Sequence, residues 1–215
     1  MLQRAVTARK ACGAHRWNGS VLAIDLFCGL GGWAEGFLAE GYDVIGFDIE
    51  MRPYPGQLVL QDVRSIDGIR LRQAVLIVAS PPCDDFSRWD QPWPNVIKNR
   101  KQPDLSLWRA AERIAREAGV PLIIENVRGA QKFLGTARAH FGKQYLWGDV
   151  PALLPAIDGR QNEGRQKQTL SGSRKAERAK IPFPLARHIA ACFKPDDSRA
   201  ALSLAPDNLS GRNAV

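Results

Sequence analysis

A thiol and a carboxylate in the middle of the chain each follow a run of apolar residues, and together they suggest nucleophilic catalysis. Cys83 comes two prolines and a serine after the run 74–79, and Glu125 comes directly after the run 121–124. Runs that are apolar throughout are typical of parallel strands covered on both faces. Open α/β sheets bind their ligands where the carboxyl ends of such strands meet. Cys83 is therefore a candidate nucleophile, and Glu125 is a candidate acid or base beside it.

A glycine-rich turn follows an earlier apolar run, residues 21–27. Gly29, Gly31 and Ala34 have the spacing of a turn whose backbone can approach a bound dinucleotide closely. Asp48 ends the next apolar stretch, 19 residues past Gly29, an offset that suits hydrogen bonds to ribose hydroxyls. The turn lacks the lysine of a triphosphate-binding loop. The pattern indicates a nucleotide-like cofactor without a triphosphate.

Strand-like and helix-like segments alternate along the chain, which predicts an α/β fold with a doubly wound, mostly parallel sheet. We expect further strands at 42–47, 57–61 and 145–147, helices at 36–40, 104–118 and 181–193, and a brief helix or turn at 69–73. Asp104 is expected to cap the helix at 104–118. The segment 84–103, with two tryptophans, three prolines and several basic residues, predicts either a lid or nucleic-acid-binding loop, or a packed surface loop. Residues 158–180 predict a polar, basic loop.

Charge is distributed unevenly along the 215 residues. The net charge of +8 arises from residues 128–195, which carry 13 basic and 4 acidic side chains, whereas residues 1–127 are neutral overall. A basic surface of this kind favours a nucleic-acid partner over a merely solvated face. We expect a basic amino-terminal arm at 1–20, one folded domain at 21–195 and a disordered tail at 196–215.

Cysteine and histidine usage argues against metal sites and disulfides. Cys12, Cys28 and Cys192 are widely spaced and are expected to be small core residues. The three histidines, at positions 15, 140 and 188, have no ligand spacing, so no metal is predicted. No run of 18 apolar residues occurs, so no membrane span is expected. These features predict a cytoplasmic protein.

Three motifs, in order, resemble those of the cytosine-5 DNA methyltransferases. The segment 25–32, Asp-Leu-Phe-Cys-Gly-Leu-Gly-Gly, is similar to the cofactor motif of this family. Pro81-Pro-Cys83, followed by Phe86 and Ser87, is similar to its catalytic motif, and Glu125-Asn126-Val127 to its third signature. Methyltransferases that act on amino nitrogens carry Asn or Asp before Pro-Pro-aromatic at that strand end, and Cys83 argues against them.

The resemblance implies a Rossmann-like fold, S-adenosylmethionine as cofactor and methylation of carbon 5 of cytosine in DNA. Cys83 would add to carbon 6 of the ring, with Glu125 and Asn126 completing the catalytic set. Phe27 would lie near the adenine, Asp48 would hold the ribose and Asp62 the adenine amino group. The full set of residues implied at the cofactor is Asp25, Phe27, Gly29, Gly31, Gly32, Asp48, Asp62 and Pro81. The set implied at the substrate is Ser87, Arg138 and Lys143.

Three departures from the family pattern bear on substrate choice and cofactor binding. The family's separate target-recognition region is reduced to a basic segment within 148–180, which predicts short or relaxed sequence specificity. The family's Asn-Ser pair before the last helix is replaced by Ala179-Lys180, and Arg138 or Lys143 would have to supply the charge of its usual arginines. Such compactness suits an enzyme of a phage or a restriction-modification system, acting in a bacterial or phage-infected cell.

Three readings of the function remain open at this point. The leading one is DNA cytosine-5 methylation, on single-stranded DNA or on a base flipped out of the duplex. The second is a nucleic-acid-binding module of the same fold that is inactive or needs a protein partner for recognition. The third keeps the chemistry and changes the substrate to RNA.

Overall fold

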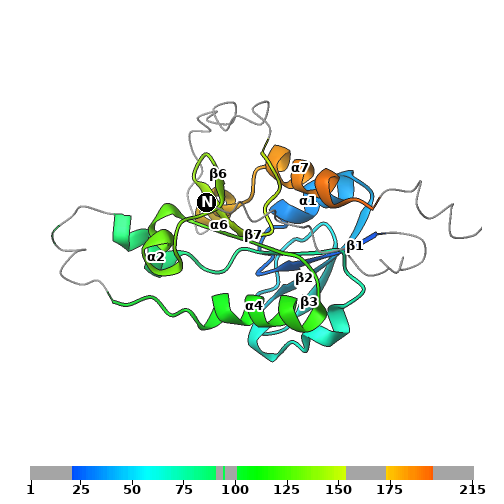
Figure 1. The fold of residues 1–215 in the computed structure, drawn as a ribbon, viewed down its shortest axis with the longest axis horizontal. Helices are drawn as coiled ribbons and strands as arrows, with labels where there is room; N and C mark the ends of the chain where they lie inside the picture. The colour runs from blue at the N-terminus through cyan, green and yellow to red at the C-terminus, as the bar shows by residue number, and fades with distance from the viewer. Residues whose placement is uncertain (1–20, 91–93, 95–100, 154–172, 196–215) are drawn as a thin grey trace, which may run out of the picture.

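The described chain forms one mixed sheet of seven strands. The computed structural model describes residues 21–90, 94, 101–153 and 173–195 (Figure 1). The strand order is β3 (Gln57–Leu60), β2 (Tyr42–Asp48), β1 (Val21–Leu26), β4 (Leu76–Ala79), β5 (Leu122–Asn126), β7 (Gln144–Gly148) and β6 (Ala139–Phe141). The first five strands in this order run parallel, and β7 and β6 are antiparallel to their neighbours. The predicted doubly wound, mostly parallel sheet is therefore confirmed.

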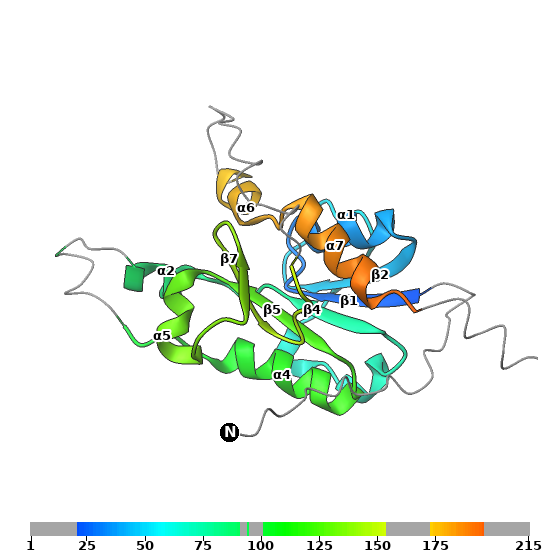
Figure 2. The same cartoon turned by 45° about the horizontal axis from the view of Figure 1, so that its top comes forward.

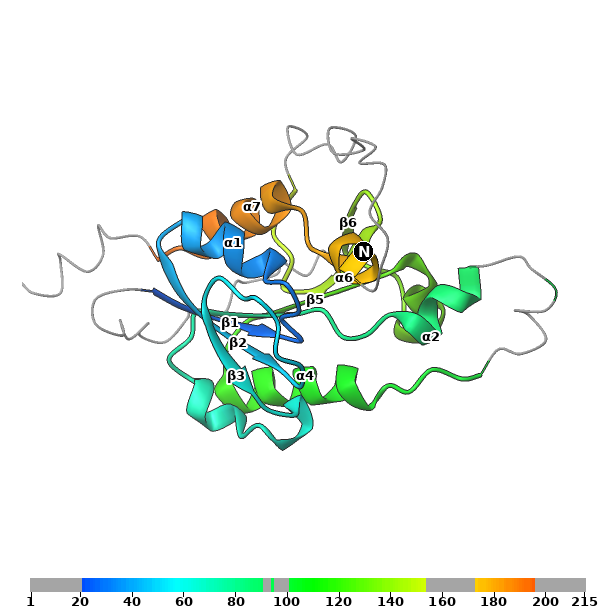
Figure 3. The same ribbon diagram turned by 180° about the vertical axis from the view of Figure 1, so that it is seen from behind.

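Helices cover both faces of this sheet, as the turned view in Figure 2 shows. On one face α1 (Gly32–Ala39) and α7 (Phe183–Phe193) lie side by side (Figure 3). Their apolar side chains belong to one of two buried hydrophobic clusters of the protein. On the other face α4 (Ser106–Ala118) packs with two short 3-10 helices, η1 (Val63–Ser65) and η2 (Gly68–Leu71). The buried strands read as continuous apolar runs because both of their faces are covered.

The predicted helix boundaries agree with the structure to within a few residues. Asp104 does assist the start of α4, because its carboxylate accepts hydrogen bonds from the Ser106 amide and hydroxyl, each at 2.8 Å. The N-cap position itself is Leu105, and Gly119, with φ 68°, ends the helix. In α7, Pro184 occupies the first turn, where its missing amide hydrogen leaves no intrahelical bond unmade.

The structure corrects several expectations about the loops. Residues 84–90 do not form an open loop but fold into α2 (Asp84–Ser87) and η3 (Arg88–Asp90). Part of the predicted loop 158–180 is a helix, α6 (Ser173–Ala179). The strand β6 was not predicted, and neither were η4 (Arg128–Ala130) and α5 (Gln131–Leu134). The arm 1–20, Trp93, most of the recognition segment and the tail 196–215 lie outside the described residues.

Cysteine burial follows the expectation only in part. Cys28 is buried, as expected of a core residue, whereas Cys192 is exposed on α7 and the core prediction for it is wrong. Cys12 lies outside the described residues. Within the described ranges no helix is long and apolar enough to cross a membrane.

Candidate active site

The candidate residues lie side by side at the carboxyl ends of the parallel strands, at the topological switch point of the sheet between β1 and β4. Leu26 pairs with Ala79 and Ala79 pairs with Ile124, so the next residues of the three strands emerge at one edge. These next residues are Phe27, Ser80 and Glu125. The chain on one side of the switch point turns into the glycine-rich segment, and on the other side into the Pro-Pro-Cys segment. This is the crevice in which open α/β sheets bind their ligands.

Cys83 lies in a short connection that is anchored to the neighbouring strand. It occupies the N-cap position of α2, is partly exposed, and its carbonyl accepts the Ser87 amide at 2.9 Å. The buried Asn126 donates from Nδ2 to the Pro81 carbonyl at 3.0 Å, while its Oδ1 accepts the Val127 amide at 2.9 Å. The side-chain amide of Asn126 thus holds the cysteine segment in position against β5.

The Glu125 carboxyl has a pKa close to neutral pH. Burial raises its pKa from the ordinary value to about 7, and two neighbours oppose that effect by favouring the charged form. One neighbour is the Ser80 side chain, which hydrogen-bonds to the carboxyl, and the other is the positive charge of Lys143. The Ser80 hydroxyl in turn accepts the indole N–H of Trp33 at 3.0 Å. Glu125 can therefore carry or release a proton near pH 7.

The glycine-rich turn is compact and in close contact with its surroundings. At Gly31, with φ 75°, an added Cβ would lie 2.4 Å from Cδ of Pro55, and at Gly32 it would lie 2.5 Å from the Ile181 amide nitrogen. Phe27 adopts a left-handed conformation, φ 59°, that non-glycine residues rarely adopt. Gly31 and Gly32 are thus required by close packing of protein atoms, whereas an added Cβ at Gly29 would meet only the Phe27 carbonyl oxygen, at 4.0 Å.

Asp48 braces this turn from the end of β2. Its Oδ2 accepts the Gly29 amide at 2.9 Å, and its Oδ1 accepts the Glu50 amide at 3.0 Å. The carboxylate is partly exposed, so it retains lone pairs that could accept ribose hydroxyls. The sequence predicted a ribose contact for Asp48, and its direct contact with the turn was not predicted.

Asp25 lies beneath the turn and is fully buried. Its Oδ2 accepts the hydroxyl of Tyr54 at 3.2 Å, and its Oδ1 has no partner among the described residues. Burial is the main cause that raises the pKa of Asp25 to about 8, so the carboxyl is mostly protonated at neutral pH. Tyr54 was missed from the sequence, although it packs against Gly31 and Gly46 and has its own pKa raised by burial.

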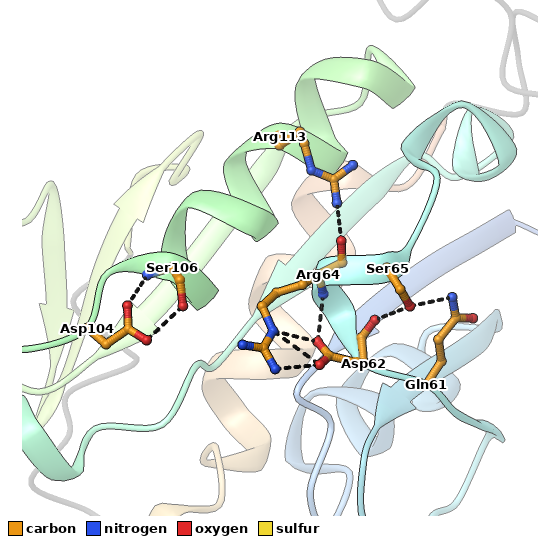
Figure 4. Close-up of polar contacts among 7 residues, drawn as sticks. All are labelled: Gln61, Asp62, Arg64, Ser65, Asp104, Ser106 and Arg113. Carbon is orange, nitrogen blue, oxygen red and sulfur yellow. Dashed lines mark hydrogen bonds and ion pairs between the residues drawn. The ribbon is translucent and has the colours of Figure 1, made fainter.

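Asp62, the other predicted cofactor residue, is already paired with a cation (Figure 4). Arg64 donates to it from its backbone amide at 2.9 Å and from Nη2 at 2.6 Å. These hydrogen bonds from Arg64 are the main reason that the pKa of Asp62 is lowered. In the same view Arg113 donates to the Arg64 carbonyl at 3.1 Å, which fixes η1 against α4. An adenine amino group at Asp62 would have to share the carboxylate with Arg64.

The predicted substrate residues are not all brought to Glu125. Lys143, in the turn between β6 and β7, is the one whose charge acts on that carboxyl, and its ammonium also donates to the Arg178 carbonyl. Arg138 instead donates from Nε to the Val150 carbonyl at 3.1 Å. Ser87 donates back to the Asp84 carbonyl within α2 at 3.0 Å. Of these three residues, Lys143 is the one that supplies a positive charge to Glu125.

An aromatic cluster next to the Cys83 segment supports α2 and η3. The rings of Trp89 and Phe133 pack edge to face with centroids 4.9 Å apart, and Phe86 packs against the same phenylalanine at 6.0 Å. Lys132 donates to the Trp89 carbonyl at 2.6 Å. Trp89 is thus a packing residue here, which favours the packed alternative over base contact for this tryptophan.

A cavity of about 800 Å³ opens beside the site, between the β6–β7 turn, α6 and the start of α7. Lys143 and Lys180 line it, and Lys180 pairs with Glu35 of α1 at 2.5 Å. The side chain of Lys180 also lies against the backbone at Gly32, where an added Cβ would meet its Cγ at 2.9 Å. The described residues hold no cluster of three His, Cys, Asp or Glu side chains that could bind a metal.

Comparisons with known proteins place this geometry in a family. A family model described as C-5 cytosine-specific DNA methylase matches residues 21–136, just over half of the chain. Similar solved structures include a mutant of Spodoptera frugiperda DNMT2 (20% identity, TM-score 0.35, covering 53% of this chain and 37% of that one). S. pombe Dnmt2 methyltransferase (18%, TM-score 0.37) is covered over 53% of this chain and 36% of that one.

A third similar structure is the Entamoeba histolytica methyltransferase EhMeth, with 17% identity and a TM-score of 0.38 over 54% of this chain and 41% of that one. This chain therefore spans less than half of the length of the three solved structures. No curated protein matches its sequence.

Proposed function

The chain belongs to the C-5 cytosine-specific DNA methylase family, and we propose that it methylates carbon 5 of cytosine in DNA through a covalent adduct at Cys83. The family match over residues 21–136 confirms the family identified from the motifs. The observation that carries the finer proposal is the carboxyl of Glu125, with a pKa of about 7, on the strand next to the one that leads to Cys83. The chemistry needs a thiolate and a carboxylic acid at one sheet edge.

The residues around the glycine turn fit an S-adenosylmethionine molecule, which the family uses. Gly31 and Gly32 are closely packed in this turn, Gly29 is open on its Cβ side, and Asp48 offers a partly exposed carboxylate beside it. Phe27 and Asp25 lie at the start of the same turn, and Pro81 and Asp62 on the neighbouring segments. Bound there, the cofactor would supply an electrophilic methyl group on a sulfonium.

Cys83 and Glu125 would act on the ring together. The Cys83 thiolate would form a sulfur–carbon bond at carbon 6, and the protonated Glu125 would give its proton to ring N3, which takes up the displaced electron pair. Carbon 5 would then be nucleophilic enough to take the methyl group, and the sulfur that carried it would leave as a neutral thioether. Loss of the carbon 5 proton to a base, departure of the Cys83 thiolate and return of the N3 proton to Glu125 would restore the aromatic ring.

The substrate contacts are proposed from the charges near the site. Lys143 would lie beside the base, and Ser87 would lie close to the nucleic-acid strand that carries this base. Arg138 would contact the nucleic acid from further along the β6–β7 hairpin. The base must leave the stack to reach Cys83, at a cost of a few kcal/mol that phosphate contacts offset. We further propose one methyltransferase domain over 21–195, with short or relaxed specificity because the recognition segment is small.

The direct test is nucleoside mass spectrometry after incubation with S-adenosylmethionine and unmethylated DNA of mixed sequence, single- and double-stranded. We expect 5-methylcytosine with the natural protein and none with Cys83→Ala. A matched incubation with RNA separates the two nucleic acids. If methylated cytosine appears in RNA alone, the substrate is RNA. If neither nucleic acid is methylated by a folded protein that binds the cofactor, the inactive or partner-dependent module is favoured.

A further inference from the structure

Glu125 is connected to the start of α1 by side-chain hydrogen bonds that the mechanism above does not use. Trp33 follows the glycine turn directly and is buried, with 1% of its surface exposed. Its indole N–H donates to the Ser80 hydroxyl at 3.0 Å, and Ser80 hydrogen-bonds to the Glu125 carboxyl. We infer that Ser80 is the positioning residue for Glu125, and that Trp33 fixes the direction in which the Ser80 hydroxyl donates.

The backbone geometry supports a fixed relation between Ser80 and Glu125. The residues before them, Ala79 and Ile124, are partners in the parallel register of β4 and β5, so Ser80 and Glu125 share one face of the sheet. The Ser80 amide donates to the Leu26 carbonyl at 3.1 Å, which holds the serine against β1 as well. Neither residue can shift far along the edge without breaking these bonds.

The two hydrogen bonds, from Trp33 to Ser80 and from Ser80 to Glu125, form a relay whose direction follows from which groups can donate and which can accept. An indole N–H only donates, so the Ser80 oxygen must accept from Trp33. A hydroxyl has one hydrogen to donate, and with its oxygen engaged by Trp33 that hydrogen is directed to Glu125. A hydroxyl that accepts one hydrogen bond also becomes a better donor in the next. The relay therefore favours the charged carboxylate and opposes the effect of burial.

Other titratable groups on the neighbouring elements do not replace this contact. Lys143 from the β6–β7 turn also favours the charged form of Glu125. Asp25 on β1 is hydrogen-bonded to Tyr54, and Glu35 on α1 is paired with Lys180. Removal of the Ser80 hydroxyl should therefore raise the pKa of Glu125, with Lys143 still present in both proteins.

The inference rests on the proposed role of Glu125, but its test needs no turnover. Protein labelled with ¹³C at glutamate carboxyls is titrated by NMR, and the Glu125 signal is assigned by its loss in Glu125→Gln. We expect Ser80→Ala to raise the titration midpoint by about one pH unit, the scale of one hydrogen bond to a charged group. Ser80→Thr, which keeps the hydroxyl, should restore the midpoint.

Two tryptophan variants test the second half of the relay. Trp33→Phe should move the midpoint in the same direction as Ser80→Ala, by less, because the hydroxyl remains but is no longer held. Trp108→Phe is the matched control, since Trp108 is also buried but donates to Glu112 on α4, at 2.9 Å, across the sheet from this site. The Glu125 titration midpoint of Trp108→Phe should equal that of the natural protein.

The outcomes separate this inference from the proposed function. A Glu125 midpoint that is unchanged in folded Ser80→Ala, or equal shifts in Trp33→Phe and Trp108→Phe, would overturn it even if the protein methylates DNA. Shifts as expected in a protein that methylates nothing would uphold the relay and leave the reaction to be reassigned. In an active enzyme, Ser80→Ala should move the pH profile of kcat and leave KM for DNA nearly unchanged.

Discussion

The Gly29 amide and the Asp48 carboxylate are joined by a hydrogen bond of 2.9 Å that connects the turn after β1 to the end of β2. The same carboxylate also accepts the Glu50 amide at 3.0 Å. Asp48 therefore has a structural role in shaping the turn in addition to its proposed contact with a ribose. A turn shaped in advance costs less conformational entropy when a ligand binds.

Replacement of Asp48 should weaken cofactor binding through both roles. Asp48→Asn loses the charge and one of the two acceptor oxygens, so we expect S-adenosylmethionine affinity to fall at least about tenfold, or 1.4 kcal/mol. Isothermal titration calorimetry measures this directly. Asp43→Asn, an equal charge change at an exposed position of the same strand, is the control. Equal affinities of the two variants would remove Asp48 from the cofactor site.

Only one of the described cysteines should be needed for turnover. We expect Cys83→Ala to lower the rate of methyl transfer by at least about a thousandfold while the cofactor still binds, because no nucleophile remains to attack carbon 6. Cys192→Ala, which removes an exposed thiol from α7, should leave the rate unchanged. DNA containing 5-fluorocytosine, which cannot lose a proton from carbon 5, should form an adduct that resists denaturation with the natural protein and with Cys192→Ala, but not with Cys83→Ala.

The charge of Lys143 should set the upper pH limit of activity. Because this charge lowers the pKa of Glu125, Lys143→Gln should raise that pKa above about 7. The reaction needs the protonated carboxyl, so the alkaline limb of the kcat profile should move to higher pH. Lys143→Arg keeps the charge and should keep the limb in place. A limb that does not move in Lys143→Gln would mean that another group controls it.

Asp25 should make the protein less stable as the pH rises. Its pKa is about 8 in the folded protein and close to 4 when unfolded, so the folded state holds the extra proton between these values. The unfolding free energy should therefore fall from pH 4 to pH 8, by up to about 5 kcal/mol from this group. Asp25→Asn, which is neutral throughout, should remove that part of the slope.

Urea unfolding of both proteins at a series of pH values checks this expectation, and the difference between them cancels the contribution of other groups such as Glu125. Tyr54 can still donate to the asparagine oxygen, so the hydrogen bond is preserved in the variant. Parallel curves for the two proteins would show that Asp25 is ionised in the folded state.

The parallel part of the fold was predictable because buried strands leave a simple signal. The runs that became β1, β4 and β5 are apolar at nearly every position, and a glycine-rich turn or a Pro-Pro pair ends two of them. The edge strand β6 gives no such signal, since it is three residues long and His140 on it is exposed. Its pairing with β7 depends on the tertiary contacts of the hairpin.

The candidate site was predictable only where strand ends define it. Cys83, Glu125 and Asp48 follow apolar runs, and their meeting point follows from sheet topology. Ser80, Trp33 and Tyr54 were missed because their partners are remote in sequence: 47 residues separate Trp33 from Ser80, and 29 separate Tyr54 from Asp25. For Ser80 and Trp33, adjacency to the Pro-Pro-Cys and glycine motifs was the available signal, and Tyr54 had none.

The packing of α7 on α1 has a consequence for how the chain folds during synthesis. The Tyr42 hydroxyl donates to the Ala190 carbonyl at 2.8 Å and Arg187 pairs with Glu40, over separations of 148 and 147 residues. While the ribosome is still making the middle of the protein, α1 has no helix to cover its apolar side. Such long-range closure is slow, so this side of α1 stays uncovered until α7 emerges from the ribosome.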